Sequence, residues 1–194
     1  MNIIKGFSTI FLFICFILII TDCFVVEADT CKPSGKLKGK NPMARPCDSH
    51  SLEICPLIFG VLHFYTTYKC LPPVSSHTKA KLIINSFKLG GDGGGLSEWD
   101  NHYHSDNDPV VALSTGWFNY KKRCLKYINI HGNGKSVKAK VVDECDSRMG
   151  CDSVHDYQPP CPNNIVDASK AVWKAFGFLE KNWGEMDIYW SDID

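Results

Sequence analysis

The 194-residue sequence has no excess of charge of either sign, because 21 lysine and arginine residues balance 21 aspartate and glutamate residues. Nucleic acids and anionic membrane surfaces attract chains with a basic surplus. The sequence also has no apolar run long enough for a membrane-spanning helix, which needs about 20 residues. Neither nucleic acid nor a membrane is therefore expected as a partner.

Several short motifs that mark common sites are missing as well. There is no Asn-x-Ser/Thr sequon for N-linked glycan, no Cys-x2-Cys pair typical of structural zinc, and no Gly-x-Ser-x-Gly of serine hydrolases. The acidic stretch 143–152 lacks the residue order of an EF-hand loop, so calcium is not supported. No cofactor is expected.

Glycine, by contrast, is concentrated at 90–95, where the sequence GGDGGG is interrupted only by Asp92. Phosphate-binding loops require G-x-x-x-x-G-K-[ST], or G-x-G-x-x-G opening a helix, and neither pattern is present. We expect these glycines to allow a tight loop that approaches neighbouring backbone, rather than to hold an anion.

The first 28 residues have the features of a secretory signal peptide. Lys5 precedes an uncharged apolar run at 10–20, and the stretch ends with small residues up to Ala28. An uncleaved membrane anchor is the alternative, but this run is too short to span a bilayer. We expect residues 1–28 to be removed and the protein to be secreted.

Cysteine is abundant, with ten residues in the chain, eight of which follow the expected signal peptide. An even number of cysteines in a small secreted protein predicts a disulfide framework of up to four bridges. Eight cysteines allow 105 connectivities, so the sequence leaves the pairing open. The cysteines expected in bridges are Cys31, Cys47, Cys55, Cys70, Cys124, Cys145, Cys151 and Cys161.

Composition divides the remaining chain into two parts. Residues 29–77 are rich in cysteine, lysine, proline and glycine and contain one strand-like run at 60–70. Residues 78–194 have the alternating and β-branched patterns of a mostly β domain. Strands are expected at 80–89, 110–118, 124–130, 137–143 and 185–190. The turn sequence HGNGKS predicts that 124–130 and 137–143 pair as a hairpin.

One helix is expected in the segment VDASKAVWKAFGF. Asp167 is placed to cap its first turn, and Gly177 is placed to end it in the left-handed conformation. Many short strands combined with a single helix favour a small closed barrel.

Longer motifs show a family resemblance. The segments VVALSTGWFN, VKAKVVDECD and NNIVDASKAVWKAFG resemble the six-stranded double-psi β-barrel shared by barwin, the first domain of expansins and family-45 endoglucanases. TKAKLIINSFKLGGDGGG and WGEMDIYWSD are more specifically similar to the kiwellin and ripening-related proteins of plants. The resemblance implies a mainly β fold. Residues 78–194 would form the double-psi barrel with one or two short helices, preceded by a disulfide-stapled segment.

The resemblance also implies a function. Kiwellin-like proteins are secreted plant defence proteins that bind and neutralise secreted microbial enzymes, with fungal chorismate mutase effectors as the known type of target. A member of this family is therefore expected to be a non-enzymatic protein of the apoplast or cell wall. The alternative is a cell-wall polysaccharide-binding module of expansin or barwin type, which rests on the fold alone.

Two positions depart from the kiwellin pattern, which has a Cys-Cys pair where this chain has Cys55-Pro56 and a cysteine at the place of Trp99. Both absences keep the cysteine count even. The hypothesis is that the two missing cysteines are bridge partners lost together, so that no free thiol remains.

Two aspartates are the only weak candidates for catalysis. The family-45 enzymes invert at the sugar, which takes two carboxyl groups. Asp167 matches their acid, but the strand 80–89 that should carry the partner has no carboxylate, and a helix cap explains Asp167 more simply. For Asp143, two roles remain equally open. Its side chain could face a substrate groove, or it could accept hydrogen bonds from turn amides beside Cys145.

The loop after the glycines contains the best surface candidates. Trp99 lies in this loop, whereas Trp173 is expected to pack from the helix, and at most one of Trp117 and Phe118 is expected on the surface. The expected binding residues are Trp99, Asp100, His102, Tyr103, His104, Tyr120 and Asp143.

The same loop has an H-x-H pair that a metal can use. His102 and His104 would point to one side of a strand, with Asp106 as a further ligand. The sequence offers no other ligand, so no metal is expected.

Overall fold

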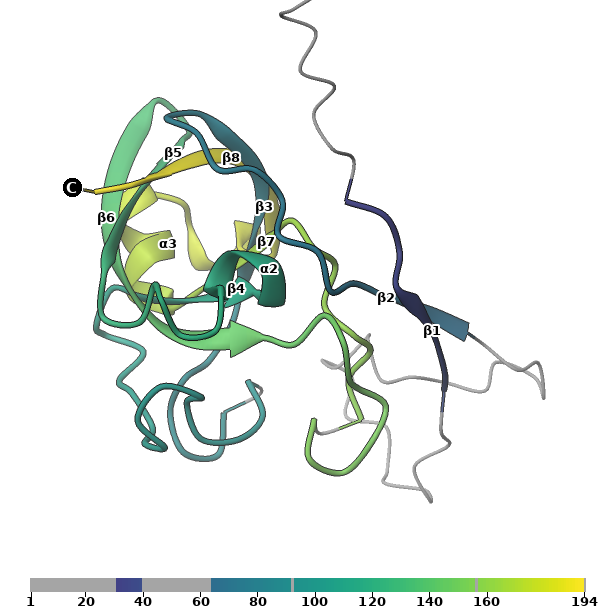
Figure 1. The fold of residues 1–194 in the computed structure, drawn as a ribbon. Helices are drawn as coiled ribbons and strands as arrows, with labels where there is room; N and C mark the ends of the chain where they lie inside the picture. Colours follow the sequence, from purple (N-terminus) through teal and green to yellow (C-terminus); the bar gives the residue numbers. More distant parts are fainter. Residues whose placement is uncertain (1–30, 40–63, 92, 156, 194) are drawn as a thin grey trace, which may run out of the picture. The chain divides into compact units, whose positions relative to one another are not determined.

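Six strands close into a barrel in the computed structural model, which describes residues 31–39, 64–91, 93–155 and 157–193 (Figure 1). Around the barrel the order is β3-β7-β4-β6-β5-β8. The strands are β3 (Thr78–Ile84), β4 (Val110–Ser114), β5 (Tyr127–Gly132), β6 (Lys135–Cys145), β7 (Ile165–Ala168) and β8 (Glu185–Asp192). This architecture confirms the expected six-stranded double-psi barrel.

Two of the six strand pairs are parallel, β3 with β7 and β4 with β6, and the other four are antiparallel. Alternate side chains of each strand fill the barrel, as the two-residue period requires. Trp117 and Trp190 meet edge to face in this core, with ring centroids 5.2 Å apart. Other fully buried core residues include Leu82, Val111, Leu113, Ile128, Ile130, Val141, Val166 and Phe176.

The hairpin prediction is confirmed. β5 and β6 pair antiparallel up to Gly132 and Lys135, and the two residues between them form the turn. Asn133 and Gly134 have φ values of 47° and 68°, which is the left-handed geometry that a two-residue hairpin turn requires.

The strand expected at 110–118 is wrong after Ser114, because the chain turns there into the short helix α2 (Thr115–Phe118). Both aromatic residues of α2 are buried, Trp117 at 2% and Phe118 at 1% exposure. One helical turn brings both rings to the core, which a strand with alternating faces would not do.

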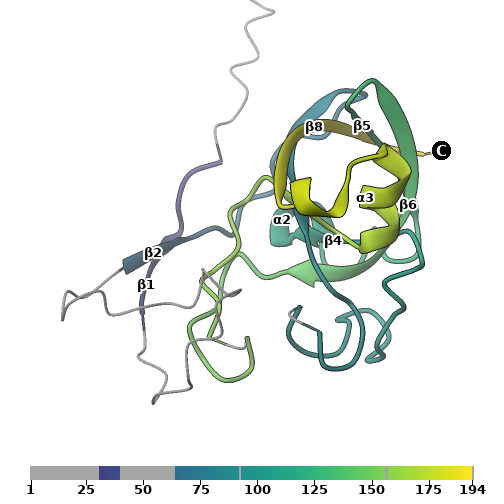
Figure 2. The ribbon, with the colours of Figure 1, turned by 180° about the vertical axis from the view of Figure 1, so that it is seen from behind.

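The helix after β7 is α3 (Lys170–Phe176), which packs against β6 and β7 (Figure 2). Its N-cap position is occupied by Ser169, so the assignment of Asp167 as the cap is wrong. Asp167 instead belongs to β7, which the sequence analysis did not predict. Gly177 ends the helix at φ 82°, as predicted, and Trp173 is buried. A 3-10 turn, η2 (Glu180–Asn182), leads into β8.

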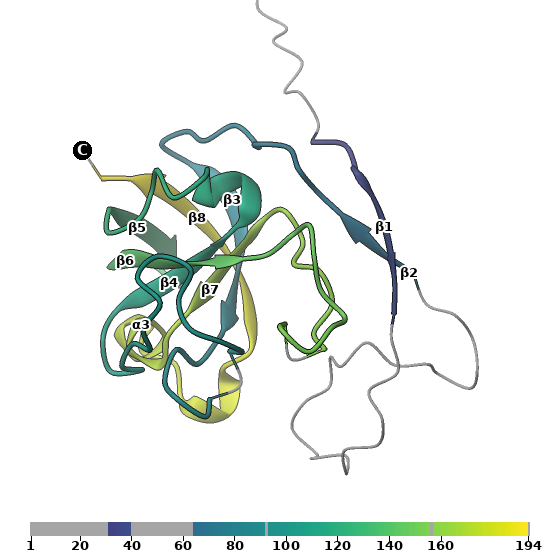
Figure 3. The same ribbon diagram turned by 60° about the horizontal axis from the view of Figure 1, so that its bottom comes forward.

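The N-terminal part contains an antiparallel pair of short strands, β1 (Gly35–Lys38) and β2 (Phe64–Thr67) (Figure 3). β2 lies within the run predicted at 60–70, and β1 was not predicted. Residues 1–30, with the expected signal peptide, and 40–63 lie outside the described residues. Within the described part of the chain, no helix is long and apolar enough to span a membrane.

Disulfides join Cys31 to Cys70 and Cys145 to Cys161, and Cys151 is also disulfide-bonded. Cys124 is a free thiol, so its assignment to a bridge is wrong, and so is the hypothesis that no free thiol remains. Cys47 and Cys55 lie outside the described residues, where their expected bridges stay a prediction.

Candidate binding surface

The loop 96–104 is fastened to the end of β6 by two hydrogen bonds. The hydroxyl of Ser97 donates to the carbonyl oxygen of Val142 at 2.5 Å, and the N–H of Glu98 donates to Oδ1 of Asp143 at 2.8 Å. Ser97 is only 5% exposed. The loop therefore begins on a buried polar anchor rather than lying free on the barrel.

Further hydrogen bonds hold the loop to itself. The Ser97 N–H donates to the His102 carbonyl at 3.0 Å, and the Asn101 N–H donates to the Ser97 carbonyl at 2.9 Å. Oδ1 of Asp100 accepts the N–H of His102 at 3.1 Å and lies 3.4 Å from Nε2 of His104. The predicted residues Asp100, His102 and His104 thus come together, and their contacts shape the loop.

Asp143 lies beneath this loop, and its Oδ1 accepts the N–H groups of Glu98 and Glu144, each at 2.8 Å. Burial raises the pKa of Asp143 to about 6, and the nearby glutamate charges add to this, although the two N–H donors act in the opposite direction. Of the two roles that the sequence left open, the structure shows the holding of backbone amides.

Large side chains project outward from the anchored loop and from the neighbouring turn. Trp99 and Tyr103 are 37% and 38% exposed, Leu96 is 43% exposed, and Tyr120 is 84% exposed. The Lys121 ammonium lies 3.0 Å from Oε1 of Glu98, so an ion pair links the turn to the loop. We call Leu96, Trp99, Tyr103 and Tyr120 the loop surface.

The two candidate catalytic carboxyls lie in one row of the sheet. Ala112 on β4 pairs with Asp143 on β6 and with Asp167 on β7, so two strand spacings, about 10 Å, separate their Cα positions. Ala112 is 2% exposed and packs with Phe87 and Val142 on the outside of the barrel. The residue midway between the two carboxyls is thus buried in apolar packing.

Asp106 does not join the two histidines that were considered with it as metal ligands. It is 8% exposed, and its carboxylate accepts the Ser86 hydroxyl at 2.9 Å and the Phe87 N–H at 2.8 Å. His102 instead contacts the Asp100 carbonyl through Nδ1 at 2.6 Å. In the described ranges, no three His, Cys, Asp or Glu side chains are placed to hold a metal.

Two glycines of the cluster show why this loop needs them. A Cβ on Gly93 would lie 1.9 Å from the Ser86 carbonyl oxygen, and Gly94 has a φ of 84°. Close approach to backbone and a left-handed conformation are the two conditions that only glycine meets without strain. Their role is therefore conformational, as expected from the missing phosphate motifs.

The free thiol of Cys124 lies in the turn between α2 and β5. Burial raises its pKa to about 11, Lys121 lowers it, and the carboxylates of Asp143, Glu98 and Glu144 raise it further. Cys124 is thus within electrostatic range of Glu98, the neighbour of Trp99. A thiol with so high a pKa is mostly protonated at neutral pH and a weak nucleophile.

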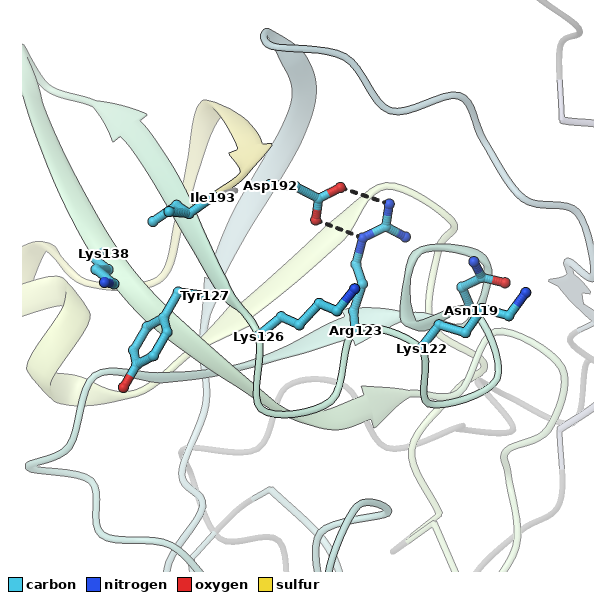
Figure 4. Close-up of a pocket in the computed structure, with 8 residues that line it drawn as sticks. All are labelled: Asn119, Lys122, Arg123, Lys126, Tyr127, Lys138, Asp192 and Ile193. Carbon is cyan, nitrogen blue, oxygen red and sulfur yellow. Dashed lines mark hydrogen bonds and ion pairs between the residues drawn. The ribbon is translucent and has the colours of Figure 1, made fainter.

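A basic pocket of about 670 Å³, not predicted from the sequence, is lined by residues of the same turn and of the strands beside it (Figure 4). Four of its lining residues carry positive charge and one carries negative charge. Its cations come from residues 122–126 and from β6, so no single sequence motif predicts the pocket. The pocket is lined by Asn119, Lys122, Arg123, Lys126, Tyr127, Lys138, Asp192 and Ile193.

A family profile described as Kiwellin-1 matches residues 21–193 of the sequence. The chain belongs to the kiwellin family. Similar proteins include "Kiwellin" of Actinidia chinensis var. chinensis, with 62% identity over 128 residues that make up 66% of this chain. The "Ripening-related protein grip22" of Vitis vinifera is 50% identical over 84% of this chain. "Ripening-related protein 3" of Oryza sativa subsp. japonica is 47% identical over 87% of this chain and 78% of its own length.

This chain spans 60% of the length of the Actinidia protein and 64% of that of the Vitis protein. Among solved structures, it is similar to a Clavibacter michiganensis expansin, with a TM-score of 0.44 and 17% identity over 61% of this chain and 50% of that one. A Streptomyces papain inhibitor gives a TM-score of 0.43 over 63% of this chain and 98% of that one.

Proposed function

We propose that this kiwellin is a secreted, non-enzymatic protein of the plant apoplast that binds and neutralises a secreted microbial protein through its loop surface. One observation supports this most: large aromatic side chains stand exposed on a loop whose backbone is hydrogen-bonded to the barrel. Loops presented on a rigid scaffold are where recognition usually resides.

The chemistry of the loop surface suits a protein partner. Tryptophan and tyrosine are the residues most enriched among the few that dominate protein–protein binding energy. Anchoring through Ser97, Asp143 and the Glu98–Lys121 pair lowers the conformational entropy that binding would otherwise cost. The partner expected for such a surface presents an apolar pocket or groove for Trp99.

A binding role also agrees with the surroundings of the two candidate catalytic carboxyls, Asp143 and Asp167. Hydrolysis by inversion needs an acid, a base and room for water between them. Asp143 holds two amides, and the buried Ala112 separates it from Asp167. These contacts favour a scaffold over a glycosidase, and heat-sensitive release of sugar from β-glucan, lost in Asp167→Ala, would contradict the proposal.

The experiment is a pull-down with the full secreted chain from apoplastic fluid of infected plants, with fluid from uninfected plants as control. A purified fungal chorismate mutase effector is the first defined partner to titrate. Specific capture of a microbial protein, with loss of that protein's activity in the complex, is the expected result. Strong retention on cellulose or chitin with no protein captured would favour the neutral polysaccharide-binding alternative.

A further inference from the structure

We propose that a second surface, distinct from the loop surface, binds an anionic carbohydrate chain of the uronate type. This basic surface consists of the pocket described above and the outer face of β5 beside it, with Ser136 and Lys140 of β6 and Ser191 of β8; the carboxylates farther along β8, Glu185 and Asp187, lie outside it and pair with Lys81. It does not rest on the protein-binding proposal, because it uses none of the residues of the loop surface.

The pocket is positive although the whole chain is neutral. Lys122, Lys126 and Lys138 line it, and among the described residues no carboxylate pairs with any of the three. Arg123 is already engaged, because its Nε and a terminal nitrogen contact Asp192 at 2.9 and 3.0 Å (Figure 4). Three ammonium groups are thus left to attract an anion.

Tyr127 organises two of the nearby cations. The ammonium of Lys138 lies 4.2 Å from the centre of its ring, and that of Lys140 lies 5.6 Å from it. A cation over the face of an aromatic ring is attracted to it, which restricts the position of the ammonium group. The pocket therefore presents partly positioned donors rather than freely moving lysines.

Beyond the pocket, the outward side chains of β5 and its neighbours are mostly polar and include the ring of Tyr189, which is 41% exposed opposite His131. The Ser136 hydroxyl donates to Asn129 Oδ1 at 2.6 Å across the hairpin, and Ser191 pairs with Asn129 from β8. At the far end His131 stacks on His77, with ring centroids 6.4 Å apart. Hydroxyl, amide and imidazole groups along one face are partners for the hydroxyls of a sugar chain.

The composition of this basic surface distinguishes its ligand from other polyanions. Lysine is depleted at protein–protein interfaces, and the one arginine here is neutralised by Asp192. Single-stranded nucleic acid needs open ring faces for its bases. Here Lys138 lies over Tyr127, and His77 contacts the rings of both His131 and Tyr189. A chain of hydroxyl-rich rings bearing carboxylates matches both the lysines and the polar face.

The test is calorimetric titration of the full secreted chain with a de-esterified polygalacturonate fragment at low ionic strength. The same fragment with its carboxylates methyl-esterified keeps the shape of the chain and removes its charge. The pocket variant, Lys126→Gln/Lys138→Gln, removes two of the three lysine charges that line the pocket. The matched control, Lys36→Gln/Lys69→Gln, removes the same charge from exposed lysines in β1 and just after β2.

We expect the de-esterified fragment to bind at least about tenfold more tightly than the esterified one, because exposed ion pairs are lost with the charge. The pocket variant should lose a similar factor, and the control variant should bind like the wild type. Absence of binding, equal binding of both fragments, or an equal loss in the control would overturn the proposal. Tighter binding of a poly-glutamate peptide or an oligodeoxynucleotide of equal charge would overturn it too, in favour of another polyanion.

Discussion

The loop surface and the basic surface both draw residues from the turn 119–125 but are built in different ways. The loop surface presents large rings on a backbone that buried polar groups hold to β6. The basic surface presents long cations on regular strands, with Tyr127 and Asp192 positioning some of them. The first is suited to a partner that must fit its shape, and the second to a partner recognised mainly by charge.

Truncation at the loop surface should have the largest effect. Trp99→Ala is expected to weaken binding of the captured protein by at least about 2 kcal/mol, roughly 30-fold, because an exposed tryptophan on a fixed loop is a typical hot spot. Surface plasmon resonance measures the change. Leu179→Ala, which removes a side chain that is 64% exposed elsewhere, is the control. If Trp99→Ala instead lowers the melting temperature strongly, Trp99 is a core residue and the loop surface is wrongly defined.

The next largest effect concerns salt, which should weaken binding at the basic surface more than binding at the loop surface. Raising sodium chloride from low to about physiological ionic strength shortens the screening length to about 8 Å. Uronate binding by the basic surface should then fall several-fold, whereas protein binding through Trp99 and Tyr103 should change less than twofold. Titrations of each ligand at two salt concentrations decide this, and equal salt dependence for both would remove the distinction drawn between them.

Asp143 predicts a dependence of stability on pH. Its folded pKa, about 6, lies above the ordinary value of 3.8, so burial favours the protonated form. Stability therefore falls as pH rises from about 4 to about 6, and the full cost of the buried charge is present above pH 6. Asp143→Asn keeps an acceptor oxygen for the two amides without the charge. The variant should be more stable than wild type at pH 7.5 by roughly 1–2 kcal/mol.

At pH 4 the two proteins should be about equally stable, because the wild-type carboxyl is then mostly protonated. Urea unfolding at both pH values provides the measurement. A difference between variant and wild type that stays the same at the two pH values would contradict this account of the charge on Asp143.

The smallest expected effect concerns Cys124, in the turn that joins the two surfaces. Its raised pKa and partial burial predict slow reaction with a thiol reagent at pH 8 and faster reaction after unfolding without a reducing agent. Peptide mapping by mass spectrometry locates the label. Finding Cys124 unlabelled in the unfolded, non-reduced chain would restore its assignment to a bridge.

The sequence predicted those parts of the fold that local chemistry determines. Asn133 and Gly134 specify the hairpin turn, and Gly177 specifies the end of α3, whatever surrounds them. α2 could not be predicted, because VVALSTGWF continues a β-like pattern and burial of Trp117 and Phe118 turns the chain into a helix. Asp167 was misplaced for a related reason, since pairing with β3 and β4 extends the chain through the expected cap.

The same distinction between local and long-range determinants applies to the candidate sites. Loop 96–104 could be found because its aromatic and polar residues are consecutive in sequence. The basic pocket could not, because Lys122, Lys138 and Asp192 come together only when β5, β6 and β8 pair in the closed barrel. The free state of Cys124 likewise depends on which cysteines the fold brings together.

Hydrogen exchange of the complex with the captured microbial protein tests the central claim most directly. Binding is expected to slow exchange in 96–104 and 119–121 and to leave the amides of β1 and β2 unchanged. Protection confined to residues outside these two segments, in a complex that inhibits the microbial protein, would contradict the assignment of recognition to the loop surface.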